Sequence, residues 1–220
     1  MEVLKKNSLF KGVEEKSLKQ MLERETIKLV SYNKNTIIAQ ENECCQRLGL
    51  IVEGEISVQK ISLNGALIKI QSYKENENFG AALLYNHEHQ YPFTLIAAIN
   101  TTILYITIEQ VDFLMESSVC FCKNYINFLS GRVRLFNRKI HILSHKYVRE
   151  RLILFYAGEA RKVGKTEFET EYSKTEISDL IGVARPSVSR ELKNMQQEGL
   201  LEIEGRRVKL IRKELFFLQG

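Results

Sequence analysis

Several residue types are scarce in this chain, and each scarcity excludes a class of protein. The 220 residues include no tryptophan, two prolines and four cysteines, which exclude a dense disulfide scaffold and a long proline-rich linker. No apolar run approaches the roughly 18 residues that a membrane span needs. The opening residues, Met1–Lys6, lack an apolar stretch of signal-peptide length. We therefore expect a cytoplasmic protein that does not contact a membrane.

Acidic residues are absent from the middle of the chain. Residues 118–144 carry five basic residues and no acidic ones. Residues 1–117 carry 12 basic and 15 acidic residues, whereas residues 145–220 carry 15 basic and 12 acidic ones. This distribution indicates that only the back half of the chain meets a polyanion.

Residues 37–108 have the pattern of a β domain. Six short apolar runs are separated by turn residues, and they cover 36–39, 48–52, 56–61, 66–72, 93–98 and 103–108. Runs at this spacing predict an all-β barrel or jelly roll, and Asn64-Gly65 predicts a hairpin turn. Apolar residues at helical spacing predict helices over 8–30 and 108–117.

The clearest periodic pattern lies in residues 118–144. Its apolar residues alternate three and four apart: Val119, Cys122, Ile126, Leu129, Val133, Phe136, Ile140 and Leu143. Such an a/d seam, kept over more than three heptads, favours pairing with a second helix. The pattern predicts a parallel homodimer rather than a helix that packs only against its own domain.

The segment 173–192 predicts two helices joined by a tight turn, after a helix over 145–163 and an edge strand over 168–172. Ser173 or Thr175 can cap the first helix, and Gly182 permits a left-handed turn. Pro186 suits the first turn of the second helix. The apolar runs 200–203 and 208–211 then predict a hairpin. Together these elements predict a helix-turn-helix with a wing.

The outer face of this motif carries donors suited to DNA. Arginines recognise guanine edges, and hydroxyls and lysines contact phosphates. The residues expected to contact DNA are Arg185, Pro186, Ser187, Ser189, Arg190 and Lys193 on the second helix and Arg206 and Arg207 at the hairpin tip. The alternative is a small helical domain with a solvated basic face.

At this point the chain resembles a known family. Residues 173–211 resemble the winged helix-turn-helix of bacterial transcription regulators of the Crp/Fnr family, and 48–58, Asn78-Phe79-Gly80 and 9–12 resemble their cyclic-nucleotide-binding-type jelly roll. The resemblance implies that Arg190 reads a base edge and that Arg185 contacts phosphate or base. A glutamate often found where Pro186 sits is absent, which leaves the preferred half-site open.

The resemblance also implies an effector site, and here the sequence departs from the nucleotide-binding members. Ala81 replaces the glutamate that binds ribose, Tyr91-Pro92 replaces the Arg-Ser pair that holds phosphate, and Phe136-Asn137 replaces a Thr-Ser pair that contacts adenine. Losing the charged partner of the phosphate removes about 2–5 kcal/mol of the binding free energy of a cyclic nucleotide. We therefore expect no cyclic-AMP binding and no cofactor. Either the core is filled or a neutral or aromatic ligand is held by Gly80, Ala81, Ala82, Tyr91, Pro92, Phe93, Thr94, Phe136 and Asn137.

Cysteines and histidines offer other candidate sensors. Cys44-Cys45 and the pair Cys120 and Cys122 suit thiol redox sensing, but the chain has no Cys-rich run for an iron–sulfur cluster. His87 and His89 could bind a metal or haem, although they look like exposed turn residues. We expect no metal site.

These observations predict an α+β protein with three parts. Residues 1–117 form a jelly-roll (double-stranded β-helix) sensor domain, 118–144 a dimerisation helix, and 145–220 a winged helix-turn-helix domain. No catalytic constellation is recognisable, so the chain is predicted to be a dimeric regulator that binds a pseudo-palindromic promoter site in double-stranded DNA and contacts RNA polymerase. We expect the regulator to be controlled by a small molecule other than cyclic AMP, by a redox signal, or by neither. The alternative is a degenerate sensor module that acts through a protein partner.

Overall fold

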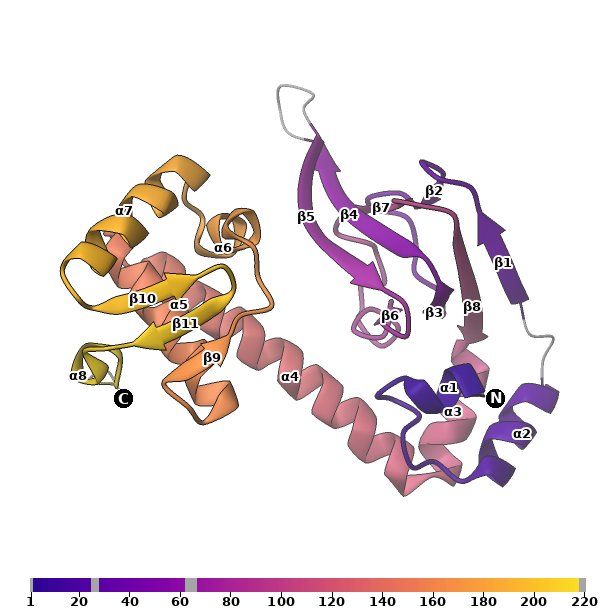
Figure 1. Cartoon of the computed structure of the whole chain (residues 1–220). Helices are drawn as coiled ribbons and strands as arrows, with labels where there is room; N and C mark the ends of the chain where they lie inside the picture. Colours follow the sequence, from indigo (N-terminus) through magenta and orange to yellow (C-terminus); the bar gives the residue numbers. More distant parts are fainter. Residues whose placement is uncertain (1, 25–27, 62–66, 218–220) are drawn as a thin grey trace. The chain divides into compact units, whose positions relative to one another are not determined.

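The computed structural model describes residues 2–24, 28–61 and 67–217, and Figure 1 shows their elements. The chain divides into two compact units, 1–131 and 132–220. No helix among the described residues is long and apolar enough to cross a membrane. The predicted turn at Asn64-Gly65 lies outside the described residues.

The first unit is a β roll of two four-stranded sheets. One sheet has the order β1 (Lys28–Tyr32), β8 (Thr101–Thr107), β3 (Arg47–Glu53) and β6 (Asn78–Phe79). The other has the order β2 (Ile37–Ala39), β7 (Thr94–Ala97), β4 (Glu55–Ile61) and β5 (Leu67–Lys74). All pairs are antiparallel, which is the arrangement of a jelly roll. The predicted β domain and α+β class are confirmed.

Three helices of the first unit lie before the roll in sequence and directly after β8. They are α1 (Glu2–Lys6), α2 (Glu15–Arg24) and α3 (Ile108–Ser117). The predicted helix over 8–30 is confirmed only over α2, because Leu9 and Val13 are buried in the turn-containing segment before it and Leu29 lies on β1. Asn7 stabilises that turn, since its Oδ1 accepts from the Leu9 amide at 3.0 Å. The predicted helix over 108–117 is confirmed, and Thr107 and Gln110 form its capping box.

The long helix α4 (Val119–Ser144) runs from the first unit into the second. The second unit continues with α5 (Val148–Val163), β9 (Glu167–Glu169), α6 (Lys174–Ile181) and α7 (Arg185–Gln197). It ends with β10 (Leu201–Glu204), β11 (Arg207–Leu210) and α8 (Lys213–Phe217). Its three strands form one antiparallel sheet in the order β10-β11-β9. The predicted long helix, helix-turn-helix, hairpin and edge strand are therefore present.

Candidate nucleic-acid interface

The turn between α6 and α7 is built from local backbone chemistry. The Ser173 hydroxyl accepts from the Glu176 amide at 3.2 Å, and the Glu176 carboxylate accepts from the Ser173 amide at 2.7 Å. Gly182 ends α6 in the left-handed region (φ 64°), and its amide donates to the Ser178 carbonyl. A residue with a Cβ is strained at this φ. The predicted cap and turn glycine are confirmed.

Helix α7 has one buried face and one open face. Val188, Leu192 and Met195 are buried in the core of the second unit, and Pro186 lies in the first turn, where an amide hydrogen is not needed. Four of the six predicted contact residues on α7 are exposed: Arg185, Pro186, Arg190 and Lys193. Ser187 and Ser189 are partly buried beside them.

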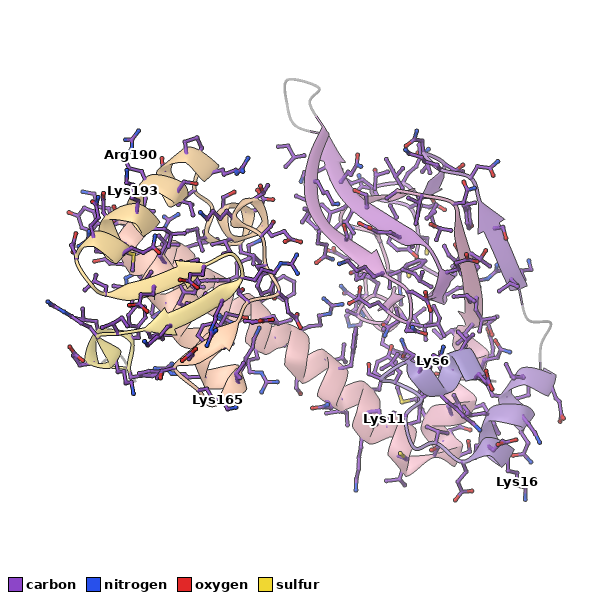
Figure 2. The ribbon with its side chains drawn as sticks, in the orientation of Figure 1. Lys6, Lys11, Lys16, Lys165, Arg190 and Lys193 are labelled. Atoms are coloured by element: carbon purple, nitrogen blue, oxygen red, sulfur yellow. The ribbon has the colours of Figure 1, made fainter. Side chains whose placement is uncertain are left out.

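The open face carries unpaired positive charge. Within the described parts of the chain, the side chains of Arg185, Arg190 and Lys193 form no ion pair. Figure 2 labels Arg190 and Lys193, which project from α7 into solvent. Unpaired cations on the second helix of such a motif suit the grooves and phosphates of DNA.

Arg149 holds the opposite side of α7 against α5. Its Nε donates to Glu191 at 2.5 Å, and its two terminal nitrogens donate to the Glu198 carboxylate at 2.7 Å each. These hydrogen bonds raise the pKa of Arg149 and lower the pKa of Glu198. The sequence does not predict this contact, since Glu191 and Glu198 lie 42 and 49 positions from Arg149 and no local pattern joins them.

The hairpin differs from its prediction in one respect. Arg206 lies in the turn beside Gly205 (φ 60°), but Arg207 lies on β11 and its Nε donates to Glu167 at 2.8 Å. Cross-strand pairing places Arg207 between Glu204 and Glu169. Arg207 is therefore not at the hairpin tip, and its charge is already engaged by carboxylates.

The predicted seam on α4 is largely exposed in the single chain. Exposed fractions are 72% for Val119, 63% for Ile126, 58% for Val133, 65% for Phe136 and 66% for Ile140. Leu143 is also exposed, and Cys122 and Leu129 are partly buried. A row of mostly exposed apolar side chains on one helix is typical of an interface with another chain.

The residues predicted for an effector pocket lie in different surroundings. Phe136 and Asn137 belong to the second unit and are exposed, whereas the other seven belong to the first unit. Gly80 has φ 85°. Ala81 is buried, and its carbonyl accepts from the Tyr125 hydroxyl at 2.6 Å. Ala82 and Pro92 are exposed, and Phe93 and Thr94 are partly buried.

Aromatic side chains pack against one another inside the roll. The Phe79 ring packs with Tyr73 and Tyr105, and a Cβ at Gly49 would lie 2.1 Å from this ring. The hydroxyls of Tyr105 and Tyr32 hydrogen-bond each other at 2.9 Å. Burial raises the pKa of Tyr91 and of Tyr105. In the described chain, the buried Gln59 Oε1 and Asn78 Oδ1 have no hydrogen-bond partner.

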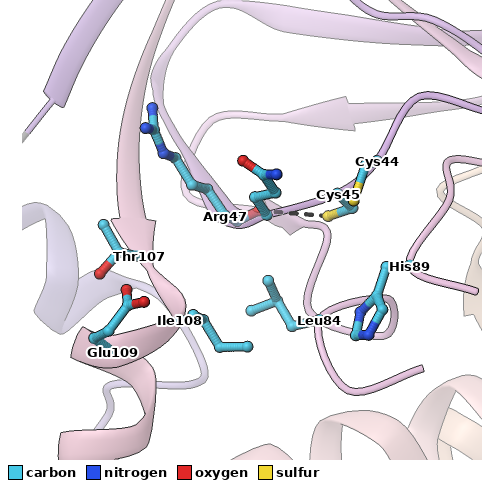
Figure 3. Close-up of a pocket in the computed structure, with 9 residues that line it drawn as sticks. Cys44, Cys45, Arg47, Leu84, His89, Thr107, Ile108 and Glu109 are labelled. Atoms are coloured by element: carbon cyan, nitrogen blue, oxygen red, sulfur yellow. Dashed lines mark hydrogen bonds between the residues drawn. The ribbon is translucent and has the colours of Figure 1, made fainter. Parts of the chain in front are cut away.

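The first unit also contains a cavity of about 470 Å³, which is lined by residues other than those predicted for the effector pocket. Figure 3 shows it between the segment 44–47, the loop residues Leu84 and His89, and the start of α3. Cys44 is exposed at this cavity and Cys45 is buried, and burial raises the pKa of the Cys45 thiol.

The cysteines and histidines do not gather into a larger cluster. All four cysteines are free. His87 is exposed, and His89 is partly buried with Nδ1 3.2 Å from the Leu83 carbonyl. Within the described ranges, no three His, Cys, Asp or Glu side chains are grouped to hold a metal ion.

Comparison with known proteins matches both units to family models. Residues 29–118 match the model of the cyclic nucleotide-binding domain, and residues 149–215 match the model of the Crp-like helix-turn-helix domain. The two matches follow each other along the chain on either side of α4. Each model therefore covers one of the two functional parts predicted from the motifs.

Individual proteins agree with these models. The chain is 29% identical over 126 residues to the transcriptional activator protein FnrA of Stutzerimonas stutzeri. The aligned region covers 55% of this chain and 52% of FnrA. The chain thus spans about half the length of the curated relatives it matches.

Two solved structures share the fold. The catabolite activator protein of Thermus thermophilus has a TM-score of 0.56 at 20% identity, with 97% of this chain and 100% of that chain covered. FixK2 from Bradyrhizobium japonicum has a TM-score of 0.58 at 20% identity, with 89% and 98% covered.

Proposed function

The chain belongs to the Crp/Fnr family, and we propose that it is a dimeric, sequence-specific DNA-binding transcription regulator and not an enzyme. The observation that carries the proposal is the open face of α7. Arg185, Arg190 and Lys193 are exposed and make no ion pair in the described chain, while Val188 and Leu192 anchor the helix in the core. Donors that are held in place and left free suit a major groove.

Pairing of two chains through the α4 seam gives this regulator its symmetry. A homodimer buries the exposed row from Val119 to Leu143 and presents two copies of α7. Recognition helices of such dimers enter successive major grooves about 34–36 Å apart. The expected target is therefore a pseudo-palindromic promoter site, at which bound protein contacts RNA polymerase in the cytoplasm.

The first unit is proposed to act without cyclic AMP. Ala81 and Tyr91-Pro92 supply no charge for a ribose and a cyclic phosphate, and the Ala81 carbonyl is occupied by the Tyr125 hydroxyl. The aromatic packing around Phe79 favours the filled-core alternative over a ligand pocket formed by Gly80–Ala82, Tyr91–Thr94, Phe136 and Asn137.

A sensor module that acts only through a protein partner is the second candidate. Such a module has no use for free cations on α7, so the unpaired Arg185 and Arg190 favour DNA. The relatives point the same way, since FnrA is named as a transcriptional activator.

The test compares two charge-removing variants on DNA. Arg190→Ala is expected to weaken binding to a duplex selected from a random pool by about 1–3 kcal/mol and to relax specificity at one position. Lys165→Ala, an exposed cation in the loop after α5, is the matched control and should bind as wild type. Fluorescence anisotropy at two salt concentrations measures both. Equal affinities for wild type and Arg190→Ala would overturn the assignment of the recognition helix.

A further inference from the structure

The back of α4, opposite the seam, is tied to the DNA-binding part of the second unit. Arg138 lies two residues from both Phe136 and Ile140, and is therefore roughly 160–200° away from them around the helix. Phe136 and Ile140 are exposed, whereas Arg138 is partly buried and turned toward α5. One face of this segment is thus open and the other is docked.

Arg138 makes a multiple contact with α5. Its Nη1 and Nη2 both donate to Glu159 Oε1 at 3.2 Å, and Nη2 also donates to the Phe155 carbonyl at 2.9 Å. Its guanidinium also lies 5.8 Å from the centre of the Phe155 ring. Glu159 is only 7% exposed. A partly buried arginine that binds a carboxylate and a carbonyl together fixes direction as well as distance.

Gly158 provides the space for this contact. A Cβ at this position would lie 2.3 Å from Arg138 Nη2 and 2.5 Å from its Cζ. Glycine inside a helix lowers helix stability, so its presence in the middle of α5 needs a reason, and the guanidinium over it supplies one. Gly131 on α4 makes the contrast, because a Cβ there would meet nothing within 4 Å.

Further contacts join the end of α4 to the turn of the helix-turn-helix. Arg151 donates to the carbonyls of Leu143 at 3.2 Å and His145 at 2.8 Å, and to those of Ile181 at 2.9 Å and Gly182 at 3.3 Å. Ile142 is buried in the same core as Val188 and Leu192. The last turns of α4, α5 and the turn before α7 therefore form one connected body.

We propose that Arg138 is a positioning residue that holds the DNA-binding elements to the back of the dimer helix, so that pairing of the seams sets the distance between the two recognition helices. The inference rests on the proposed dimeric DNA binding. Arg138 touches no DNA in this arrangement. It acts through α5, and it converts a fixed helix pair into a fixed spacing of two half-sites.

The experiment measures how strongly the affinity of the protein depends on the distance between the two half-sites. Anisotropy gives affinities of full-length protein for a selected two-half-site duplex, for the same duplex with about two base pairs inserted between half-sites, and for a single half-site. Arg138→Gln removes the positive charge and the guanidinium that donates to both Glu159 and the Phe155 carbonyl. Gly158→Ala keeps both side chains of the pair and displaces the guanidinium, so it tests the contact if Arg138→Gln fails to fold.

Two variants serve as matched controls. Lys162→Gln removes the other cation on Glu159, at 2.8 Å, which is an i,i+3 pair within α5 and does not reach α4. Gly131→Ala makes the same glycine-to-alanine change in a helix without meeting a neighbour. Sedimentation of each variant checks that it still dimerises.

Wild type is expected to prefer the selected spacing by about tenfold or more, and both Arg138→Gln and Gly158→Ala to reduce that preference to about threefold or less. Single half-site affinity should stay within about twofold, a result that a merely destabilised domain would not give. If both variants keep the wild-type spacing preference, the positioning role is wrong. If wild type itself binds no duplex selectively, the proposed function fails first, and the two failures are thereby distinguished.

Discussion

The two units differ in where their polar side chains point. In the second unit, Arg185, Arg190 and Lys193 on α7 are exposed and unpaired within the described chain. In the first unit, the hydroxyls of the interior tyrosines bond inside the protein, as Tyr105 does to Tyr32 and Tyr125 to Ala81. The second unit thus offers donors to an outside molecule, while the first uses them to close its own interior.

This difference supports the proposed DNA binding by the second unit. A binding surface needs groups that gain partners only in the complex, because groups already satisfied in the free protein give little net affinity. The α7 face meets this condition, whereas the hydroxyls of Tyr105 and Tyr125 do not.

The strongest test removes the aromatic centre of the roll. Phe79→Ala is expected to destabilise the first unit by about 3–5 kcal/mol, because a packed aromatic core leaves a cavity when truncated. Hydrogen exchange, read separately for residues of the two units, measures the loss and should show the second unit unchanged. A cost below about 1 kcal/mol would indicate a loosely filled, pocket-like interior and would end the contrast between the units.

The second test charges the open seam of α4. Val133→Asp is expected to weaken dimerisation by roughly 3 kcal/mol, since each dimer loses two buried valines and gains two desolvated carboxylates. Leu135→Asp is the matched control, because Leu135 is also exposed, at 52%, but lies off the seam. Sedimentation equilibrium measures both variants. Equal dimerisation by the two would place the interface elsewhere on the chain.

Much of the second unit could be predicted from sequence because its chemistry is local. The cap of Ser173 on Glu176, the turn at Gly182 and the inward Val188 and Leu192 are each set by neighbours within a few residues. The strands of the first unit were predictable for the same reason, since alternation and turn residues are short-range signals.

The remaining contacts depend on residues that are distant in sequence. Arg149 reaches Glu198 and Tyr125 reaches Ala81 across 49 and 44 positions. The predicted helix over 8–30 was too long, because Leu9 and Val13 fit a helical spacing but are buried in the segment before α2. Gly158 was the one local sign of the Arg138 contact, since a glycine inside a helical pattern needs a packing reason.

The third test compares the adjacent thiols at the cavity of the first unit. Cys44 is exposed and Cys45 is buried, and burial raises the pKa of the Cys45 thiol. Iodoacetamide at neutral pH is therefore expected to modify Cys44 at least about tenfold faster than Cys45, because thiolate is the reacting form. Mass spectrometry of the native protein against time measures both rates. Comparable rates would mean that the loop around His89 opens readily, contrary to a closed first unit.

The smallest effect concerns the anchor behind α7. Arg149 lowers the pKa of Glu198, so the folded pKa lies below the unfolded value of about 4.3. A group whose pKa is lowered on folding contributes stability above its unfolded pKa, and that contribution disappears as pH falls through the folded pKa. Hydrogen exchange of α7 should therefore show wild type losing protection between about pH 5 and pH 3 more steeply than Glu198→Gln. The effect is small because the pair is solvent-exposed and screened, and equal slopes for the two proteins would show that Glu191 alone anchors Arg149.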